Sequence, residues 1–349
     1  MNEKTANGRT ADRTGPGPGP ELGGRLTRGL RGRTARGLRA RTALGLGGRV
    51  ALGLGGAVVL LLAGVQGPAV AAPPVGSTPA SASAAEGSHT VELRSTAEGF
   101  TAPATTRPGL TTFNASTTQE GKGWIGLVRL KDGVGWDDFT YDLFRALGNT
   151  PAEVPQGAKD LNRDATLLGG LVIHDGQPGS FTQHLSPGTY LLFDYLAVAD
   201  AQPRYRWLTV SGSSVDQGLT PTATVVSKNV PGTGPRFEVQ GRVRAGQPVR
   251  FVNRIPGQVN EFLFVRIAEG TTEADLKAYF DSMPDDGSFP PGSPFTSVSL
   301  GSLPLSTGRS TVARVPTGTG PHALITWNKD ATDGIKLVKK GLFTIVDVD

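Results

Sequence analysis

One segment of this chain occurs twice, and this repetition limits the possible folds more than any other feature. Trp124–Leu147 reads WIGLVRLKDGVGWDDFTYDLFRAL, and residues 262–280 read FLFVRIAEGTTEADLKAYF. At an offset of 137 positions, Val-Arg-Leu falls on Val-Arg-Ile and Asp138 falls on Asp275. Each copy predicts a strand, a Gly turn and a short helix. Such a repeat indicates two similar units in tandem.

The other apolar segments are short and closely spaced, which is typical of β-sandwiches. The strands expected in the first copy are 110–114, 124–130, 167–174, 181–185, 190–195 and 207–210. Those expected in the second copy are 248–253, 262–267, 297–305, 310–315, 323–327 and 342–348. Residues 151–164 are expected to be a loop. The predicted class is all-β, with two tandem sandwiches that each carry one short helix.

Both predicted helices have recognisable starts. Asp137 and Asp138 begin the first, where carboxylates suit the positive end of the helix dipole, and Phe139 begins its apolar stripe. Before the second, Thr272 and Asp275 form a variant of the capping box.

The first 71 residues predict export. Residues 1–49 contain ten arginines, and residues 50–65 follow without a charge. This apolar run is shorter than the roughly 20 residues of a membrane span, and Ala69-Val70-Ala71 is a small-x-small cleavage motif. We therefore predict a Sec-type signal peptide over 1–71, with an uncleaved membrane anchor as the alternative. The cleaved protein would be extracellular, without membrane contact.

The mature chain is predicted to have four parts. Residues 72–90, rich in Ala, Pro and Ser, form a flexible N-terminus. Residues 91–211 form the first domain and residues 236–349 the second. Residues 212–235 are polar and rich in Gly, Pro and Thr, so we expect a linker there.

Charge and cysteine content exclude several functions. Residues 1–71 contain 11 Lys/Arg and 3 Asp/Glu, whereas the remainder contains 24 and 27. The mature part therefore lacks the clustered cations of a nucleic-acid surface, and no nucleic-acid partner is expected. The chain has no cysteine, which excludes disulfides, thiolate metal sites and cysteine nucleophiles.

The segment Leu185–Asp194, LSPGTYLLFD, together with the Val-Arg-Leu strand and its helix, resembles the cupredoxin fold in the divergent form of secreted bacterial proteins. The resemblance covers residues 97–211 and 236–349. It implies two tandem Greek-key β-sandwiches. Family members with a blue-copper site hold the metal with His2Cys and a weak axial ligand.

Carried over position by position, this resemblance implies that both copper sites are lost. The first His position falls on Gly123 and Asn260, and the Cys position falls on Asp194 and Thr326. The downstream ligand regions, 203–207 and 334–337, contain neither His nor Met. No cofactor is therefore expected.

The four histidines are His89, His174, His184 and His322. His174 and His184 end neighbouring predicted strands, and with Asp175 they could form an altered copper or zinc site. The alternative is two exposed histidines at strand ends. His322 stands where the first copy has Tyr190, so packing or hydrogen bonding is the expected role.

Paired carboxylates occur at Asp137-Asp138 and Asp285-Asp286. The first pair is explained by its helix start, and the second lies in a loop. The chain contains no Gly-x-Ser-x-Gly, Walker or His-Glu-x-x-His motif. We therefore predict no enzymatic activity, although a sandwich can host unrelated sites.

The tryptophans divide into two groups. Trp124 and Trp327 lie inside strand motifs and are expected in the core. Trp136, together with Arg204, Tyr205 and Trp207, forms a possible contact surface, because exposed aromatics near arginine are frequent at interfaces. The predicted function is a secreted, non-enzymatic protein with an extracellular binding or structural role, its partner an unknown protein or carbohydrate. The alternative is a metal-binding protein with an altered site.

Overall fold

The computed structural model describes residues 89–349, except 120–122, 201, 217 and 285–288. The predicted signal peptide lies outside these residues, as does nearly all of the predicted flexible N-terminus. In the part that is described, no helix is long and apolar enough to cross a membrane.

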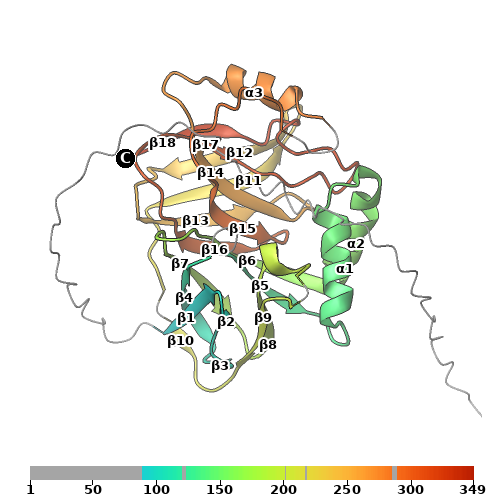
Figure 1. Ribbon diagram of the computed structural model, residues 1–349, viewed down its shortest axis with the longest axis vertical. Helices are drawn as coiled ribbons and strands as arrows, with labels where there is room; N and C mark the ends of the chain where they lie inside the picture. The colour runs from blue at the N-terminus through green and yellow to red at the C-terminus, as the bar shows by residue number, and fades with distance from the viewer. Residues whose placement is uncertain (1–88, 120–122, 201, 217, 285–288) are drawn as a thin grey trace, which may run out of the picture. The chain divides into compact units, whose positions relative to one another are not determined.

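The described chain forms two halves (Figure 1). The first half contains β1 (Thr90–Thr96), β2 (Gly99–Thr101), β3 (Thr105–Thr106), β4 (Gly109–Thr117), β5 (Trp124–Leu130), β6 (Ala165–Val172), β7 (Gly179–Leu185), β8 (Gly188–Asp194) and β9 (Tyr205–Val210). The two-residue strand β10 (Val215–Asp216) follows. The second half contains β11 (Ala223–Val230), β12 (Gly234–Gly241), β13 (Pro248–Asn253), β14 (Asn260–Arg266), β15 (Leu300–Leu305), β16 (Ser310–Arg314), β17 (Gly320–Ile325) and β18 (Thr344–Val348).

These strands build two mixed sheets that each run through both halves. Sheet A has the order β12-β11-β13-β16-β7-β4-β1-β2, with β10 beside β4, and sheet B has the order β18-β17-β14-β15-β6-β5-β8-β9-β3. The halves join through two antiparallel pairs, β7 with β16 and β6 with β15. Each half thereby covers strands of the other that would be open edges. The predicted all-β class with Greek-key sandwiches is confirmed.

The helices are α1 (Trp136–Leu147), α2 (Val154–Asp164) and α3 (Glu273–Asp281), with short 3-10 turns η1 (Pro151–Glu153) and η2 (Tyr195–Ala197). The expected loop at 151–164 is therefore wrong, and the first half has two α-helices instead of one. Pro155 is tolerated because it lies in the first turn of α2, where a missing N–H costs nothing. Gly157 lets α2 approach α1, since a Cβ there would lie 2.5 Å from Arg145. Figure 1 shows these two helices side by side.

The region expected to be an irregular linker, residues 212–235, contains all of β10 and β11. β11 pairs with both β12 and β13, and its Val225 and Val226 are buried. The flanking Thr, Ser and Lys residues make this strand look polar in the sequence, and its sheet partners are what order it. The domain boundaries themselves stay a prediction.

Sheet B is buried on both faces, which explains the uninterrupted apolar run of β14. Phe262 and Phe264 belong to the core between the sheets. Leu263 and Val265 belong to a second core on the other face of sheet B, together with residues of all three helices. A strand covered on both sides shows no apolar-polar alternation.

Candidate functional site

In the first half, the two leading copper-ligand positions are hydrogen-bonded to each other. Asp194 is the last residue of β8 and is completely buried. Its Oδ2 accepts from the N–H of Gly123 at 2.8 Å and from the Ser95 hydroxyl at 3.2 Å. Its Oδ1 accepts from the N–H of Leu196 at 3.0 Å. The carboxylate is therefore surrounded by N–H and O–H donors. In a metal site, its neighbours would instead be further metal ligands.

Arg204 extends this network. Its Nη1 donates to Ser95 Oγ at 3.2 Å and to the carbonyls of Thr96 and Gly99, and its Nη2 donates to Gln119 Oε1 at 3.2 Å. Arg204, which was predicted to belong to an exposed contact surface, is half-buried in the structure and is engaged in these contacts. Its guanidinium is directed inward because it satisfies carbonyls of the β1–β2 hairpin, and it links that hairpin to Asp194 through Ser95.

The second half has neutral residues at the same positions. Asn260 is completely buried, and its amide has no hydrogen-bond partner among the residues described. Thr326 Oγ1 accepts from the N–H of Asn328 at 3.1 Å. Neither residue supplies the thiolate that a blue-copper centre requires, so the centre fits neither half. Over the described ranges, no group of three or more His, Asp or Glu is arranged to hold a metal ion.

The structure does not bring His174 and His184 together. They were expected to face each other across a hairpin, but β6 and β7 belong to different sheets. His174 lies before β7, bridged to Gln177 and within 2.9 Å of the Ser299 carbonyl through Nε2. His184 is the next-to-last residue of β7, about 16 Å along the strand from Gly179 at 3.3 Å per residue. Asp175 stays beside His174, so the predicted two-His site is not formed.

The remaining candidates have structural roles. His322 is buried, as expected, and pairs through Nδ1 with the Gly320 carbonyl at 2.9 Å. His89 pairs with Thr106. Asp138 accepts from the N–H of Gly135 at the start of α1, which is the helix-start role expected for this acid pair. Asp285 and Asp286 lie outside the described residues.

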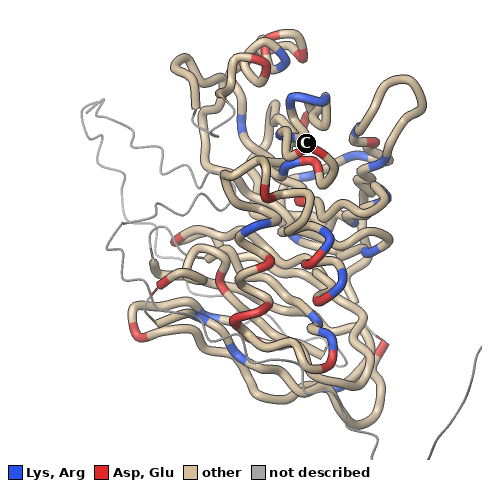
Figure 2. Tube along the Cα trace, turned by 90° about the vertical axis from the view of Figure 1, so that its right-hand side faces the viewer, with Lys and Arg blue, Asp and Glu red and all other residues tan. Residues whose placement is uncertain are grey.

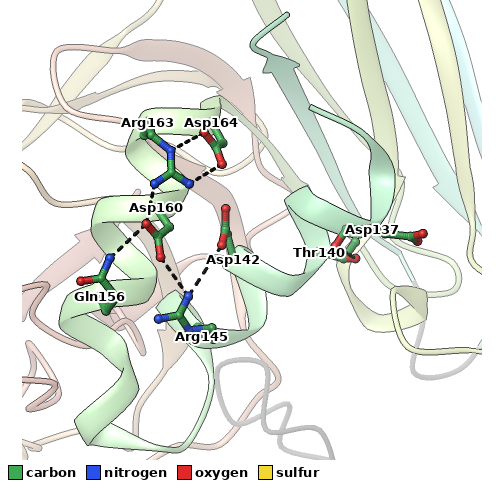
Figure 3. Close-up of polar contacts among 8 residues, drawn as sticks. All are labelled: Asp137, Thr140, Asp142, Arg145, Gln156, Asp160, Arg163 and Asp164. Carbon is green, nitrogen blue, oxygen red and sulfur yellow. Dashed lines mark hydrogen bonds and ion pairs between the residues drawn. The ribbon is translucent and has the colours of Figure 1, made fainter. Parts of the chain in front are cut away.

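A cluster of acids between α1 and α2 was not expected (Figure 3). Arg145 lies 2.9 Å from Asp160, and Arg163 bridges Asp160 at 2.7 Å and Asp164 at 2.6 Å. Burial and the neighbouring Asp164 raise the pKa of Asp142 to about 6. The arginines pair with these acids and tie the two helices together, so the cluster is a structural one.

The prediction that Trp124 and Trp327 lie in the core is confirmed, whereas Trp136 and Tyr205 are half-buried and the contact surface around them stays a prediction. Trp124 and Trp327 are buried. Trp136 stacks on Tyr205 with ring centroids 4.3 Å apart and meets Phe193 edge-on. Trp207 lies two residues beyond Tyr205, on the same face of β9, and 42% of it is exposed. These three residues, Trp136, Tyr205 and Trp207, are called the aromatic surface below.

A buried acid at the junction of the halves was missed. Glu261 on β14 accepts from the N–H of Trp327 at 2.7 Å, and burial raises its pKa to about 7. Burial and the charge of Glu261 raise the pKa of Tyr195, which belongs to the first half. The repeat contained a signal for this residue, because the offset of 137 aligns Glu261 with the buried Trp124.

Two buried lysines accompany Glu261. Lys336 Nζ lies 5.6 Å from the centroid of Trp327 and partly offsets the raised pKa of Glu261. Lys329 Nζ donates to the carbonyl of Gly148 at the end of α1, where a cation suits the negative end of the helix. Burial lowers the pKa of Lys329 to about 8.

The chain matches no protein-family model and no curated protein. Among solved structures, it is similar to auracyanin B with 20% identity, covering 37% of this chain and 91% of that one, at a TM-score of 0.22. A copper-containing nitrite reductase from Thermus scotoductus matches with 14% identity over 74% of this chain and 61% of that one, less than two thirds of its length, at a TM-score of 0.22. A copper nitrite reductase from Nitrosomonas europaea matches with 11% identity over 75% and 94%, at a TM-score of 0.21.

TM-scores this low carry no argument about function. The description of the fold rests on the strand pairing, in which β4 lies between β1 and β7 just as β13 lies between β11 and β16. The structure is a divergent cupredoxin-like fold, built without copper ligands at the positions where that family has them.

Proposed function

We propose that this chain is a secreted, non-enzymatic binding protein in which a tandem pair of copper-free sandwiches serves as a scaffold. The carrying observation is Asp194, which occupies the thiolate position and accepts three hydrogen bonds from its surroundings. A carboxylate held by three hydrogen-bond donors of the protein stabilises the fold, and a metal ion would have to displace those donors to bind it. Export would follow cleavage after Ala71.

A recurring backbone detail supports the tandem arrangement. Gly170 and Gly301 both have positive φ, at 146° and 152°. A Cβ on Gly170 would lie 2.1 Å from the Ile125 carbonyl oxygen, and one on Gly301 would lie 2.0 Å from that of Phe262. Ile125 and Phe262 are aligned at the offset of 137, so the same close approach demands glycine in each half.

Copper binding is the first test of the proposal. After incubation with copper and dialysis, elemental analysis should find far less than one copper per chain, because neither half supplies His2Cys. A blue-copper protein treated in parallel is the positive control. One retained copper per chain, lost in His184→Ala, would instead support the altered metal site.

The aromatic surface is the proposed contact region. Trp207 is exposed beside a Trp136–Tyr205 stack that holds two large rings in place, and rigid aromatic groups supply contact area at low entropic cost. Lys and Arg residues are interspersed with Asp and Glu residues along the described chain (Figure 2). This mixture favours an uncharged carbohydrate or a protein partner over a polyanion.

Trp207→Ala should weaken binding to the partner by about 2 kcal/mol or more, the loss typical of an interface hot spot. The measurement is retention of the purified protein on envelopes of the producing cells, before and after protease treatment of the envelopes. Protease-sensitive retention assigns a protein partner, and resistant retention assigns carbohydrate. Ile335→Ala is the control, since Ile335 is 43% exposed in the other half. If Trp207→Ala and Ile335→Ala are retained equally, the aromatic surface does not bind the partner, and this part of the proposal is wrong.

A further inference from the structure

A cationic pocket lies at the end of the first half that is farther from Gly123 and Asp194. It has a volume of about 310 Å³, and its lining includes the cations Arg129, Lys131 and Arg309, the acid Asp132, and His184. Arg129 is near the end of β5, whereas Gly123 precedes its first residue. The pocket is therefore separate from the former copper position and uses none of the aromatic surface.

The packing around Arg129 holds it in place. Its guanidinium carbon lies 5.5 Å from the ring centroid of Tyr190, and its Nη2 lies against Gly188, where a Cβ would approach to 3.0 Å. Tyr190 is buried, and its hydroxyl donates to the Ser186 carbonyl at 2.9 Å. A cation on such a fixed platform loses little freedom when it binds a ligand.

Arg309 comes from the second half and is positioned by contacts between the halves. The N–H of Ser306 donates to the Leu167 carbonyl, and the N–H of Leu167 donates to Ser306 Oγ, both at 2.9 Å. The N–H of Arg309 then donates to the Ser306 carbonyl at 3.0 Å. The turn between β15 and β16 is thereby fixed on β6, and the pocket requires both halves.

The cations of the pocket lack protein counterions. Arg129, Lys131 and Arg309 form no ion pair and no side-chain hydrogen bond with any residue that the structure describes. Arg266, aligned with Arg129 at the offset of 137, differs because its Nη1 donates to the Thr319 carbonyl at 2.7 Å. Gathered cations repel one another, so the pocket favours a bound anion.

We infer that this pocket binds a tetrahedral oxyanion, a phosphate or sulfate group. An arginine fork pairs with two oxygens of such a group, and the cations come from the end of β5, the segment after it and the β15–β16 turn. Three cations, two from the end of β5 and directly after it and one from the β15–β16 turn, suit a group with three accessible oxygens better than a planar carboxylate with two. The group can be a free ion or the substituent of a sugar, which share this chemistry.

The test is a titration of the full chain with inorganic phosphate and, separately, with inorganic sulfate, both at constant ionic strength. Binding is monitored by the NMR chemical shifts of the backbone amides. Saturable shifts are expected at residues 129–132, 184–190 and 306–309. Arg129→Ala and Arg309→Ala should each raise the dissociation constant about tenfold, the loss expected for one charge-assisted hydrogen bond. Arg266→Ala removes the same charge at the aligned position and should leave the constant unchanged within about twofold.

A third titration compares galactose 6-sulfate with inorganic sulfate, with galactose as the control for the sugar alone. Tighter binding of the sulfated sugar than of free sulfate assigns the anion to a glycan, and equal binding assigns a free ion. Both results uphold the oxyanion site. The inference is overturned if neither inorganic anion gives saturable shifts at these residues, or if Arg129→Ala binds phosphate as well as Arg266→Ala does.

Discussion

Replacing Asp194 with alanine should lower the free energy of unfolding by about 3–5 kcal/mol, the range for removing one partner from a buried charged network. The substitution leaves the buried N–H group of Gly123 and the buried Ser95 hydroxyl without this acceptor, and it also removes the acceptor of the hydrogen bond from the half-buried Leu196 N–H. Each buried donor left unpaired costs about 1–3 kcal/mol. Urea denaturation with an unchanged m value is the measurement.

Two further variants separate this network from a general effect of charge. Asp194→Asn keeps the shape and one acceptor oxygen, so it should fall between the wild type and Asp194→Ala. Asp347→Ala removes the same charge from an exposed position on β18 and should change stability by less than about 0.5 kcal/mol. If Asp194→Ala unfolds at the same urea concentration as Asp347→Ala, the carboxylate does not hold the former ligand positions together.

The strands β4–β9 and β13–β18 and two of the helices could be predicted from the sequence because their signals are local. The run Trp124–Leu130 is β5 with the predicted bounds, and Pro248–Asn253 is β13 with the predicted bounds. Thr272 and Asp275 form the predicted cap, with the Asp275 N–H donating to Thr272 Oγ1 at 3.2 Å. Each of these features depends on side chains within one turn or one strand.

Features that depend on distant residues could not be predicted. α2 contains Pro155 and Gly157, two residues that weaken a helix in isolation, and it exists because α1 packs against it. β11 looks like a linker until β12 and β13 supply its hydrogen bonds. In both cases tertiary contacts outweigh the local preference.

The candidate site also has features that could be predicted from the sequence and features that could not. The loss of the copper ligands is visible at single positions, such as Gly123 and Asp194. The hydrogen-bond network that replaces these ligands is not visible in the sequence, because Ser95 and Arg204 are 109 residues apart and meet only in the folded protein. Arg204 therefore looked like a surface residue beside two aromatics. The oxyanion pocket was missed for the same reason, since Arg129 and Arg309 belong to different halves.

Glu261→Gln should remove much of the pH dependence of stability. The usual pKa of this carboxyl is 4.5, and burial raises it to about 7 in the folded protein. The folded state therefore holds the proton more tightly than the unfolded chain does. This stabilisation is complete below pH 4.5 and is lost as the pH rises through 7, at 1.36 kcal/mol per unit of pKa difference, or about 3 kcal/mol in all. Glutamine keeps an oxygen that accepts from Trp327 and does not titrate.

The free energy of unfolding of Glu261→Gln, relative to the wild type, should thus rise by about 3 kcal/mol between acidic and mildly alkaline buffers. Urea denaturation across this range measures it. Asp142 and Lys329 also have shifted pKa values, but they titrate in both proteins, and their contributions cancel in the difference. Glu238→Gln makes the same chemical change at a partly exposed ion pair, where solvent screens the charge, and should leave the curve almost parallel to the wild type. Parallel curves for Glu261→Gln would mean that Glu261 stays ionised in the folded protein, with Lys336 compensating its burial.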